Sequence, residues 1–328
     1  MSSPKQYKRI VLNERPIRDF EPGTFRTETV PFDLKPGEAQ VLVQTTWLSL
    51  DPGMRIFVKD YPSYVPQIQI GEVFIPLNIL FRDLKCYKLM QGQGLGIIVQ
   101  AGPGSILAVG DTVKGRWGMT EYAVVDDSAV QKLVIPQGAD ALDFLSTLGL
   151  SGMSAYFGIK DIGKLKEGEL LVVSGAAGSV GTIACQLGKQ AGAKVYGIAG
   201  SDEKCEWLEK ELGVDGVFNY KSPNFREDFK KIGHVDVYFD NVGGGVGFIL
   251  AEAPPHLLFF LKASLDSSSS YDYALRFPEA VQLLAAGLAD GSIKRKFHIV
   301  EGGIEQAPVA LPLLFSGGNT GKLFVHSS

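Results

Sequence analysis

The chain has 328 residues, enough for two domains, and its 45% hydrophobic and 21% charged residues are typical of globular proteins. A net charge of −4 gives no electrostatic basis for binding nucleic acid or an anionic membrane surface. The three cysteines are too far apart in the sequence to indicate a disulfide framework, and no uninterrupted apolar run could span a bilayer. We therefore expect a cytoplasmic protein with no membrane partner and no nucleic-acid partner.

The first 132 residues have the pattern of a small, mainly β domain. Short aliphatic or β-branched runs lie at 41–43, 94–99 and 121–125, and Pro-Gly or Gly-Asp pairs separate them. From about residue 140 helices and strands alternate, beginning with an expected helix over 146–159. Such alternation predicts a parallel sheet covered on both faces, with ligands at the carboxyl ends of its strands.

A strand, a glycine-rich turn and a helix follow one another at residues 169–190. The apolar run 169–173 leads into Gly178 and Gly181, and the helix has an apolar face with spacing 0, +3, +4, +7. In a dinucleotide site Gly178 lets the backbone approach a diphosphate, and Gly181 lets helix and strand pack closely. The usual first glycine of the motif is Ala176 here. An ordinary glycine corner between strand and helix is the alternative interpretation.

Further elements complete the α/β pattern. Strands are expected at 194–199, 217–220 and 235–242, and helices at 203–212 and 277–288. The tail from residue 297 returns to strand-like sequence and is expected to pack on the first domain. Asn241 ends one strand, so it either faces a cofactor or serves as a turn residue before glycine.

The sequence predicts no metal site. It contains no C-x-x-C and no H-E-x-x-H motif, and its four histidines are scattered. We interpret the cysteines as packing thiols and the histidines as surface or capping residues.

Nine stretches together resemble one family, in the family's order. They are 49–55 (SLDPGMR), 63–66 (SYVP), 70–73 (IGEV), 152–158 (GMSAYFG), 177–181 (AGSVG), 200–204 (GSDEK), 218–221 (FNYK), 238–244 (YFDNVGG) and 319–322 (NTGK). As a set they are similar to the zinc-independent medium-chain dehydrogenases/reductases typified by leukotriene B4 dehydrogenase, also called prostaglandin or alkenal double-bond reductase.

The resemblance implies a fold, a cofactor and a site. The implied fold is a GroES-like, mainly β catalytic domain formed by residues 1–132 and 298–328, around a doubly wound Rossmann domain at 133–297 that is irregular at 245–275. The implied cofactor is NADPH, and the implied assembly is a homodimer. Diphosphate binding carries over to Gly178, Ser179, Val180 and Gly181, 2′-phosphate binding to Lys204, and further cofactor contacts to Tyr220, Asn241 and Asn319.

The residues that follow the expected strand 194–199 are in part those that an NADPH site favours. An NAD site favours an acid there to bind the ribose hydroxyls, whereas this chain has Gly200 and Ser201, with Lys204 supplying positive charge. Asp202 and Glu203 lie next to them and keep NAD open as an alternative.

The expected reaction is hydride transfer to the β-carbon of an α,β-unsaturated aldehyde or ketone, a small-molecule substrate. The family pattern indicates Tyr64 as the donor to the substrate carbonyl, although a tyrosine between Pro62 and Pro66 could equally pack a loop. A quinone oxidoreductase of the same superfamily and a catalytically impaired, nucleotide-binding relative are the alternatives.

The sequence departs from the family at three places, and the third, the irregular segment 245–275, motivates the impaired-relative alternative. Gly53 stands where many relatives have a tyrosine, and residues 74–89 resemble an insertion. After Gly244 the sequence no longer resembles the family until Arg276, and residues 257–261 are the candidate for a replacement strand. A sheet without a strand beside the nicotinamide site would bind the cofactor weakly or not at all.

Overall fold

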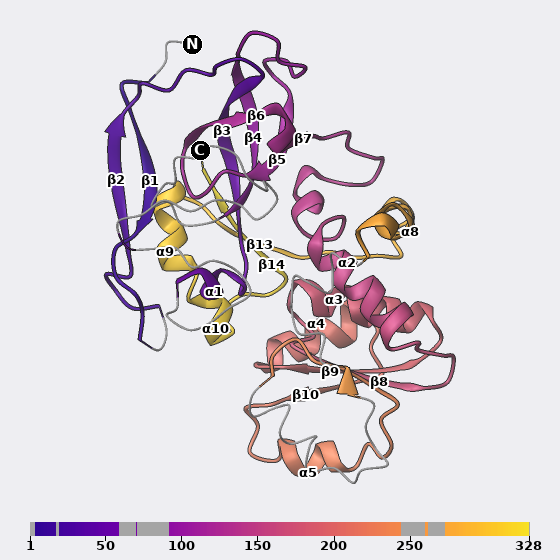
Figure 1. Ribbon diagram of the computed structural model, residues 1–328. Coiled ribbons are helices and arrows are strands. Elements are labelled where there is room, and N and C mark those ends of the chain that lie inside the picture. Colours follow the sequence, from indigo (N-terminus) through magenta and orange to yellow (C-terminus); the bar gives the residue numbers. More distant parts are fainter. Residues whose placement is uncertain are drawn as a thin grey trace. The chain divides into compact units, whose positions relative to one another are not determined.

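The computed structural model describes residues 4–17, 20–58, 70, 92–243, 260–261 and 273–327 (Figure 1). The chain forms two compact units. Unit 1 comprises Met1–Val134, His298–Asn319 and Leu323–Ser328, and unit 2 comprises Ile135–Phe297 and Thr320–Lys322. In the described residues, no helix combines the length and the apolar character that a membrane crossing needs.

Unit 1 is built on antiparallel strands. Its seven-stranded sheet has the order β13-β14-β3-β4-β5-β7, with β6 paired to β3, and β1 and β2 form a separate pair. The strands are β1 Gln6–Leu12, β2 Phe25–Pro31, β3 Gln40–Leu50, β4 Gln93–Ala101, β5 Thr112–Arg116, β6 Tyr122–Asp126, β7 Val130–Lys132, β13 Phe297–Val300 and β14 Lys322–His326. The predicted strands 41–43 and 94–99 lie in β3 and β4, residues 122–125 of the third lie in β6, and β14 in the tail pairs with β3.

Short helices complete unit 1. They are α1 Met54–Val58, α9 Ala307–Ala310 and α10 Leu313–Ser316, together with the 3₁₀ turns η1 Asp127–Ala129 and η6 Ile304–Gln306. One buried cluster joins α1 and α9 to alternate residues of β3, including Leu48 and Leu50. A second cluster contains Val41 and Val43 of the same strand.

Unit 2 contains a parallel sheet with the strand order β10-β9-β8-β11-β12. The strands are β8 Leu170–Ser174, β9 Lys194–Ala199, β10 Gly216–Asn219, β11 Val237–Phe239 and β12 Phe260–Leu261. The order reverses between β8 and β11, and such a switch point is where open α/β sheets bind ligands. β12 lies within the expected replacement strand and pairs with β11, while most of 245–275 lies outside the described residues.

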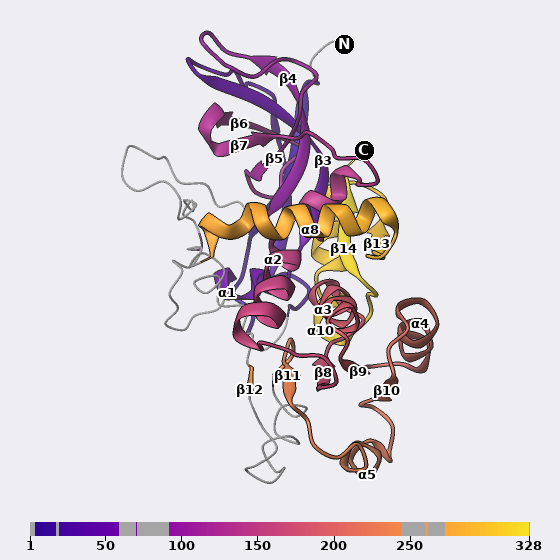
Figure 2. The ribbon, with the colours of Figure 1, turned by 90° about the vertical axis from the view of Figure 1, so that its right-hand side faces the viewer.

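Helices cover both faces of this sheet (Figures 1 and 2). The helices and helical turns of unit 2 are η2 Ala141–Leu145, α2 Leu150–Phe157, the π-helix η3 Gly158–Ile162, α3 Ser179–Gln190, α4 Asp202–Leu212, α5 Phe225–Lys230, η5 Ala274–Arg276 and α8 Phe277–Asp290, of which α3 and α5 pack on opposite faces of the sheet. Leu171 and Val173 of β8 pack in the cluster that contains α3, whereas Leu170 and Val172 pack with Phe225 of α5. This alternation confirms the expected doubly wound α/β fold of unit 2, and unit 1 is mainly β as expected.

The helix expected over 146–159 was placed too early and is less regular than predicted. Ser146 has φ −133° and ψ −98°, which are not helical, and Gly149 is extended, so α2 begins only at Leu150. The segment then continues as a π-helix to Ile162, beyond the predicted end. Glycines at 149 and 152 weaken the helical preference locally, so packing rather than propensity sets these boundaries.

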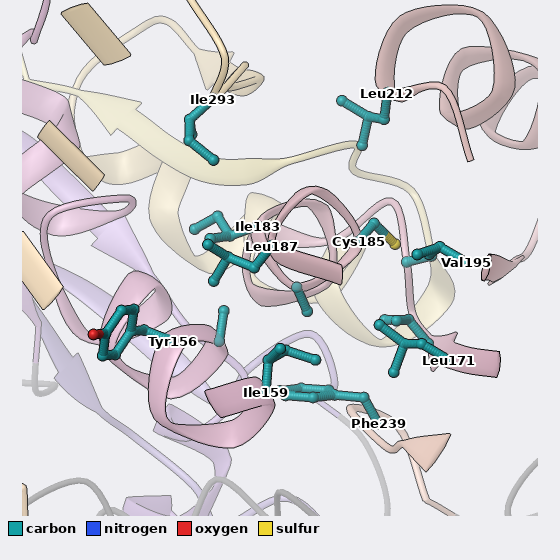
Figure 3. Close-up of a cluster of buried hydrophobic side chains, with 14 of the residues drawn as sticks. Tyr156, Ile159, Leu171, Ile183, Cys185, Leu187, Val195, Leu212, Phe239 and Ile293 are labelled. Carbon is teal, nitrogen blue, oxygen red and sulfur yellow. The ribbon is translucent and has the colours of Figure 1, made fainter. Parts of the chain in front are cut away.

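Two buried titratable groups belong to the core of unit 2. Cys185 of α3 lies beside Leu171 and Val195 in the cluster of Figure 3, and burial raises the pKa of its thiol to about 12, so it packs as a neutral group. Asp143 is fully buried, and burial raises the pKa of its carboxyl to about 6, although Arg295 Nε lies 3.3 Å from Asp143 Oδ2. Ionisation of Asp143 at neutral pH therefore lowers the free energy of unfolding of unit 2.

Candidate functional site

The glycine-rich turn joins β8 to α3 at the carboxyl edge of the sheet. Gly175 has a left-handed φ of +56°, and Gly178 is the extended residue before the first turn of α3. The first backbone N–H groups of a helix have no partner inside it, and the residue at the N-cap, Gly178, has no side chain to cap them. Together with the positive end of the helix dipole, these groups suit an anion such as a diphosphate.

The two glycines of the turn have different surroundings. A Cβ at Gly181 would lie 2.3 Å from the Gly175 oxygen and 2.7 Å from Ala176 Cα, which is the close packing of helix and strand that we expected. Among the described residues, a Cβ at Gly178 would meet only the Gly175 oxygen, at 3.1 Å, so this part of the structure leaves the position far less crowded than Gly181. A cradle of this kind, with bare backbone at an uncrowded position, fits the diphosphate of a dinucleotide.

Ser179 and Val180 form the first turn of α3. Both side chains are half-buried, and Ser179 Oγ donates a hydrogen bond to Ser151 Oγ of α2 at 2.8 Å. Since the Ser179 hydroxyl proton is donated to Ser151, an anion at this turn would bind the backbone N–H groups.

Lys204 and Tyr220 follow the neighbouring strands β9 and β10, whose last residues Ala199 and Asn219 are paired. The Tyr220 ring lies against Gly200, where an added Cβ would be 2.8 Å from Cε1. Lys204 is half-buried in α4, and its pKa is lowered first by that burial and then by the charge of Lys221. A desolvated cation at a strand end suits a phosphate better than it suits a neutral hydroxyl.

Asp202 already has a partner within the protein. Asn219 Nδ2 donates to Asp202 Oδ1 at 2.7 Å, and Ser201 caps α4 by accepting from the Lys204 N–H. Of the two acids that keep NAD open, Asp202 is thus turned toward β10, which favours NADPH over NAD.

Asn241 connects the strands on the two sides of the switch point. Its side-chain amide donates to the Ser174 carbonyl at 2.9 Å, and its backbone N–H donates to Ser174 Oγ at 2.8 Å. This geometry agrees with the structural interpretation of Asn241, while its contact with a cofactor stays a prediction.

Ser174 and Asp240 are residues that the sequence analysis missed. Ser174 Oγ donates to Asp240 Oδ1 at 2.7 Å. Asp240 Oδ1 also accepts from the backbone N–H groups of Val242 and Gly243. Asp240 is only 5% exposed. An acid directly after an apolar strand was a usable signal, but its partner could not be named before the order of the strands was known.

The segment Thr320–Lys322 lies against the glycine-rich turn within unit 2. The Gly321 N–H donates to the Ala177 carbonyl at 2.7 Å, and Gly321 forms a parallel bridge with Gly178. Gly321 has φ +72°, and a Cβ there would lie 1.9 Å from the Lys296 oxygen, so no other residue fits. Asn319 directly precedes this segment and is grouped with unit 1.

The structure brings most of the predicted cofactor residues to one edge of one sheet. Gly178–Gly181, Lys204, Tyr220 and Asn241 follow four strands that are neighbours in unit 2. Tyr64 and the insertion at 74–89 lie outside the described residues. Across the described ranges, no group of three histidine, cysteine or acidic side chains could hold a metal ion.

Comparisons with known proteins agree with this architecture. Two family models match, "N-terminal domain of oxidoreductase" over residues 8–79 and "Zinc-binding dehydrogenase" over residues 179–251. The Bacillus subtilis protein YfmJ, named as an NADP-dependent oxidoreductase, is 35% identical over 93% of this chain and 93% of its own length. The NADPH-dependent curcumin reductase of Escherichia coli is 31% identical over 97% of this chain and 96% of its own length.

Two further proteins extend the match. Prostaglandin reductase 1 of Bos taurus is 31% identical, with 94% of each chain covered. The crystal structure of CurA from Vibrio vulnificus in complex with NADPH superposes with a TM-score of 0.81 at 28% identity, covering 98% of this chain and 99% of that one. With this identity along nearly the whole sequence, the chain belongs to the zinc-independent medium-chain dehydrogenase/reductase family, together with the prostaglandin reductases.

Proposed function

We propose that this protein reduces the carbon–carbon double bond of α,β-unsaturated aldehydes or ketones by hydride transfer from NADPH to the β-carbon. The observation that carries the proposal is the full-length similarity to an NADPH-dependent curcumin reductase. Curcumin contains double bonds conjugated to carbonyl groups, which is the chemistry proposed here. The protein is an NADP-dependent oxidoreductase, and bound NADPH supplies the hydride.

The residues at the sheet edge divide the binding of NADPH among them. The backbone of Gly178, Ser179, Val180 and Gly181 would hold the diphosphate at the positive end of α3. Lys204 would bind the 2′-phosphate, and Tyr220, beside Gly200, would contact the adenosine end. Asn241 would face the cofactor at the switch point, and Asn319 would add a contact from the segment before Gly321.

The rest of the protein's work is to orient the alkene and to stabilise negative charge on the carbonyl oxygen of the substrate. A tyrosine hydroxyl can donate to that oxygen at neutral pH, and Tyr64 is our candidate. The substrate would be a small enone or enal, and the assembly a homodimer.

Isotope transfer tests this reaction directly. Purified protein is incubated without oxygen with NADPH carrying deuterium at C4 of the nicotinamide and with a 2-alkenal. We expect stereospecific incorporation of deuterium at the β-carbon, detected by NMR of the saturated aldehyde. Deuterium at the carbonyl carbon would show that the protein is an alcohol dehydrogenase instead.

Parallel assays separate the alternatives. A quinone oxidoreductase would turn over quinones much faster than alkenals under the same conditions. A catalytically impaired relative would bind NADPH tightly, as seen by nucleotide fluorescence, and would turn over neither substrate.

A further inference from the structure

Lys221 lies at the edge of the sheet where Lys204 and Tyr220 also lie. It follows β10 directly after Tyr220, and its ammonium is 5.7 Å from the centre of the Tyr220 ring. The backbone is fixed at this point, because Lys221 N–H donates to Asn219 Oδ1 at 3.0 Å and Tyr220 N–H donates to the Ala199 carbonyl at 3.0 Å. The ring of Tyr220 therefore positions the Lys221 side chain near the end of β9.

The two lysines are close enough to repel each other. The charge of Lys221 is one of the causes that lower the pKa of Lys204, after burial, while Glu203 raises it. Asp202 is held by Asn219. In the part of the chain that the structure describes, Lys221 pairs with no carboxylate. Two neighbouring cations, one exposed and one half-buried, are stabilised by an anion with two negative charges.

We propose that Lys221 is a second cation for the 2′-phosphate of NADPH and that, with Lys204, it sets the preference for NADPH over NADH. The inference rests on the proposed function, because it assumes that the sheet edge binds this nucleotide. NADH carries a hydroxyl at the same position, so it gains nothing from either lysine. Lys221 therefore contributes to the discrimination between the two nucleotides and not to the binding that they share.

Binding titrations of single variants test the role of Lys221 without any turnover. Dissociation constants for NADPH, NADH, adenosine 2′,5′-bisphosphate and ADP are measured by fluorescence for Lys221→Ala, Lys221→Arg and Lys204→Ala. Lys230→Ala is the matched control, because Lys230 is an exposed lysine on α5. We expect Lys221→Ala to weaken NADPH and the 2′,5′-bisphosphate about tenfold, the usual effect of one charge-assisted hydrogen bond.

The other measurements define the outcome. NADH and ADP affinities are expected to change by less than about twofold, and Lys221→Arg is expected to keep most of the NADPH affinity. Equal weakening of NADPH and NADH would overturn the inference, since it would indicate a general structural effect. Unchanged NADPH affinity in Lys221→Ala would also overturn it.

The same titrations distinguish this inference from the proposed function. If the unmodified protein binds neither NADPH nor NADH, both fall. Suppose instead that the unmodified protein binds NADPH and that Lys204→Ala weakens this binding. If Lys221→Ala then leaves it unchanged, only the proposed role of Lys221 is wrong. Since Lys221 is exposed, its substitutions leave the core intact, and circular dichroism of each variant verifies the fold.

Discussion

Substitution of Gly178 by alanine separates the fold of the glycine-rich turn from its capacity to bind a diphosphate. Gly178 has φ −88° and ψ 177°, an extended conformation that alanine adopts without strain. Within the described ranges, the new methyl group would meet only the Gly175 oxygen, at 3.1 Å. We therefore expect the free energy of unfolding of the nucleotide-free protein to change by less than about 1 kcal/mol.

The effect on nucleotide binding should be much larger. The methyl group lies at the start of α3, where the diphosphate must come within about 2.9 Å of backbone nitrogens. Loss of two charge-assisted hydrogen bonds, at about 1.5–3 kcal/mol each, weakens NADPH by about 3–6 kcal/mol. The dissociation constant should thus rise at least about 100-fold.

Urea denaturation without nucleotide and titration of NADPH fluorescence measure the two quantities. Gly181→Ala is the control, because its Cβ would lie 2.3 Å from the Gly175 oxygen and must disturb the fold itself. It should lose both stability and binding. The reasoning is refuted if Gly178→Ala binds NADPH as tightly as the unmodified protein, since the diphosphate then does not rest on this turn.

Three further substitutions test other features of unit 2. Ser174→Ala removes the hydroxyl that bonds Asp240 and the Asn241 N–H, and we expect a loss of about 2–4 kcal/mol in urea denaturation; a loss below about 0.5 kcal/mol would contradict this. Asp143 has a folded-state pKa of about 6, above its ordinary 3.8, so the native protein holds its proton more tightly and stability falls as pH rises between these values. Asp143→Asn should remove this decline, about 2.4 kcal/mol between pH 4 and pH 7, whereas parallel stability curves for the two proteins would refute the assignment. Gly321→Ala places a Cβ 1.9 Å from a carbonyl oxygen and should lower the melting temperature by several degrees, and an unchanged value would show that the bridge is dispensable.

The glycine-rich turn could be predicted because its geometry depends on residues that are close together in the sequence. The spacing of Gly178 and Gly181 within a strand–turn–helix pattern predicts both the backbone geometry of the turn and the end of α3 that we propose for the diphosphate. The contacts of Ser174 could not be predicted, because β8 and β11 are neighbours only through the strand order, and other elements separate them in the sequence. The start of α2 was missed because glycines near residue 150 leave the boundary to tertiary packing. Tyr64 stays a prediction.

The contact between Gly321 and the Ala177 carbonyl has a consequence for how the protein is made. A ribosome adds residues in order, so β8, α3 and β9 emerge long before Gly321 does. Until then the turn lacks its bridging partner, and a nascent chain can assemble the parallel sheet while its phosphate cradle is still incomplete. Cofactor capture would then be a late event in biosynthesis, and truncation shortly before residue 321 would yield a folded sheet with a defective cradle.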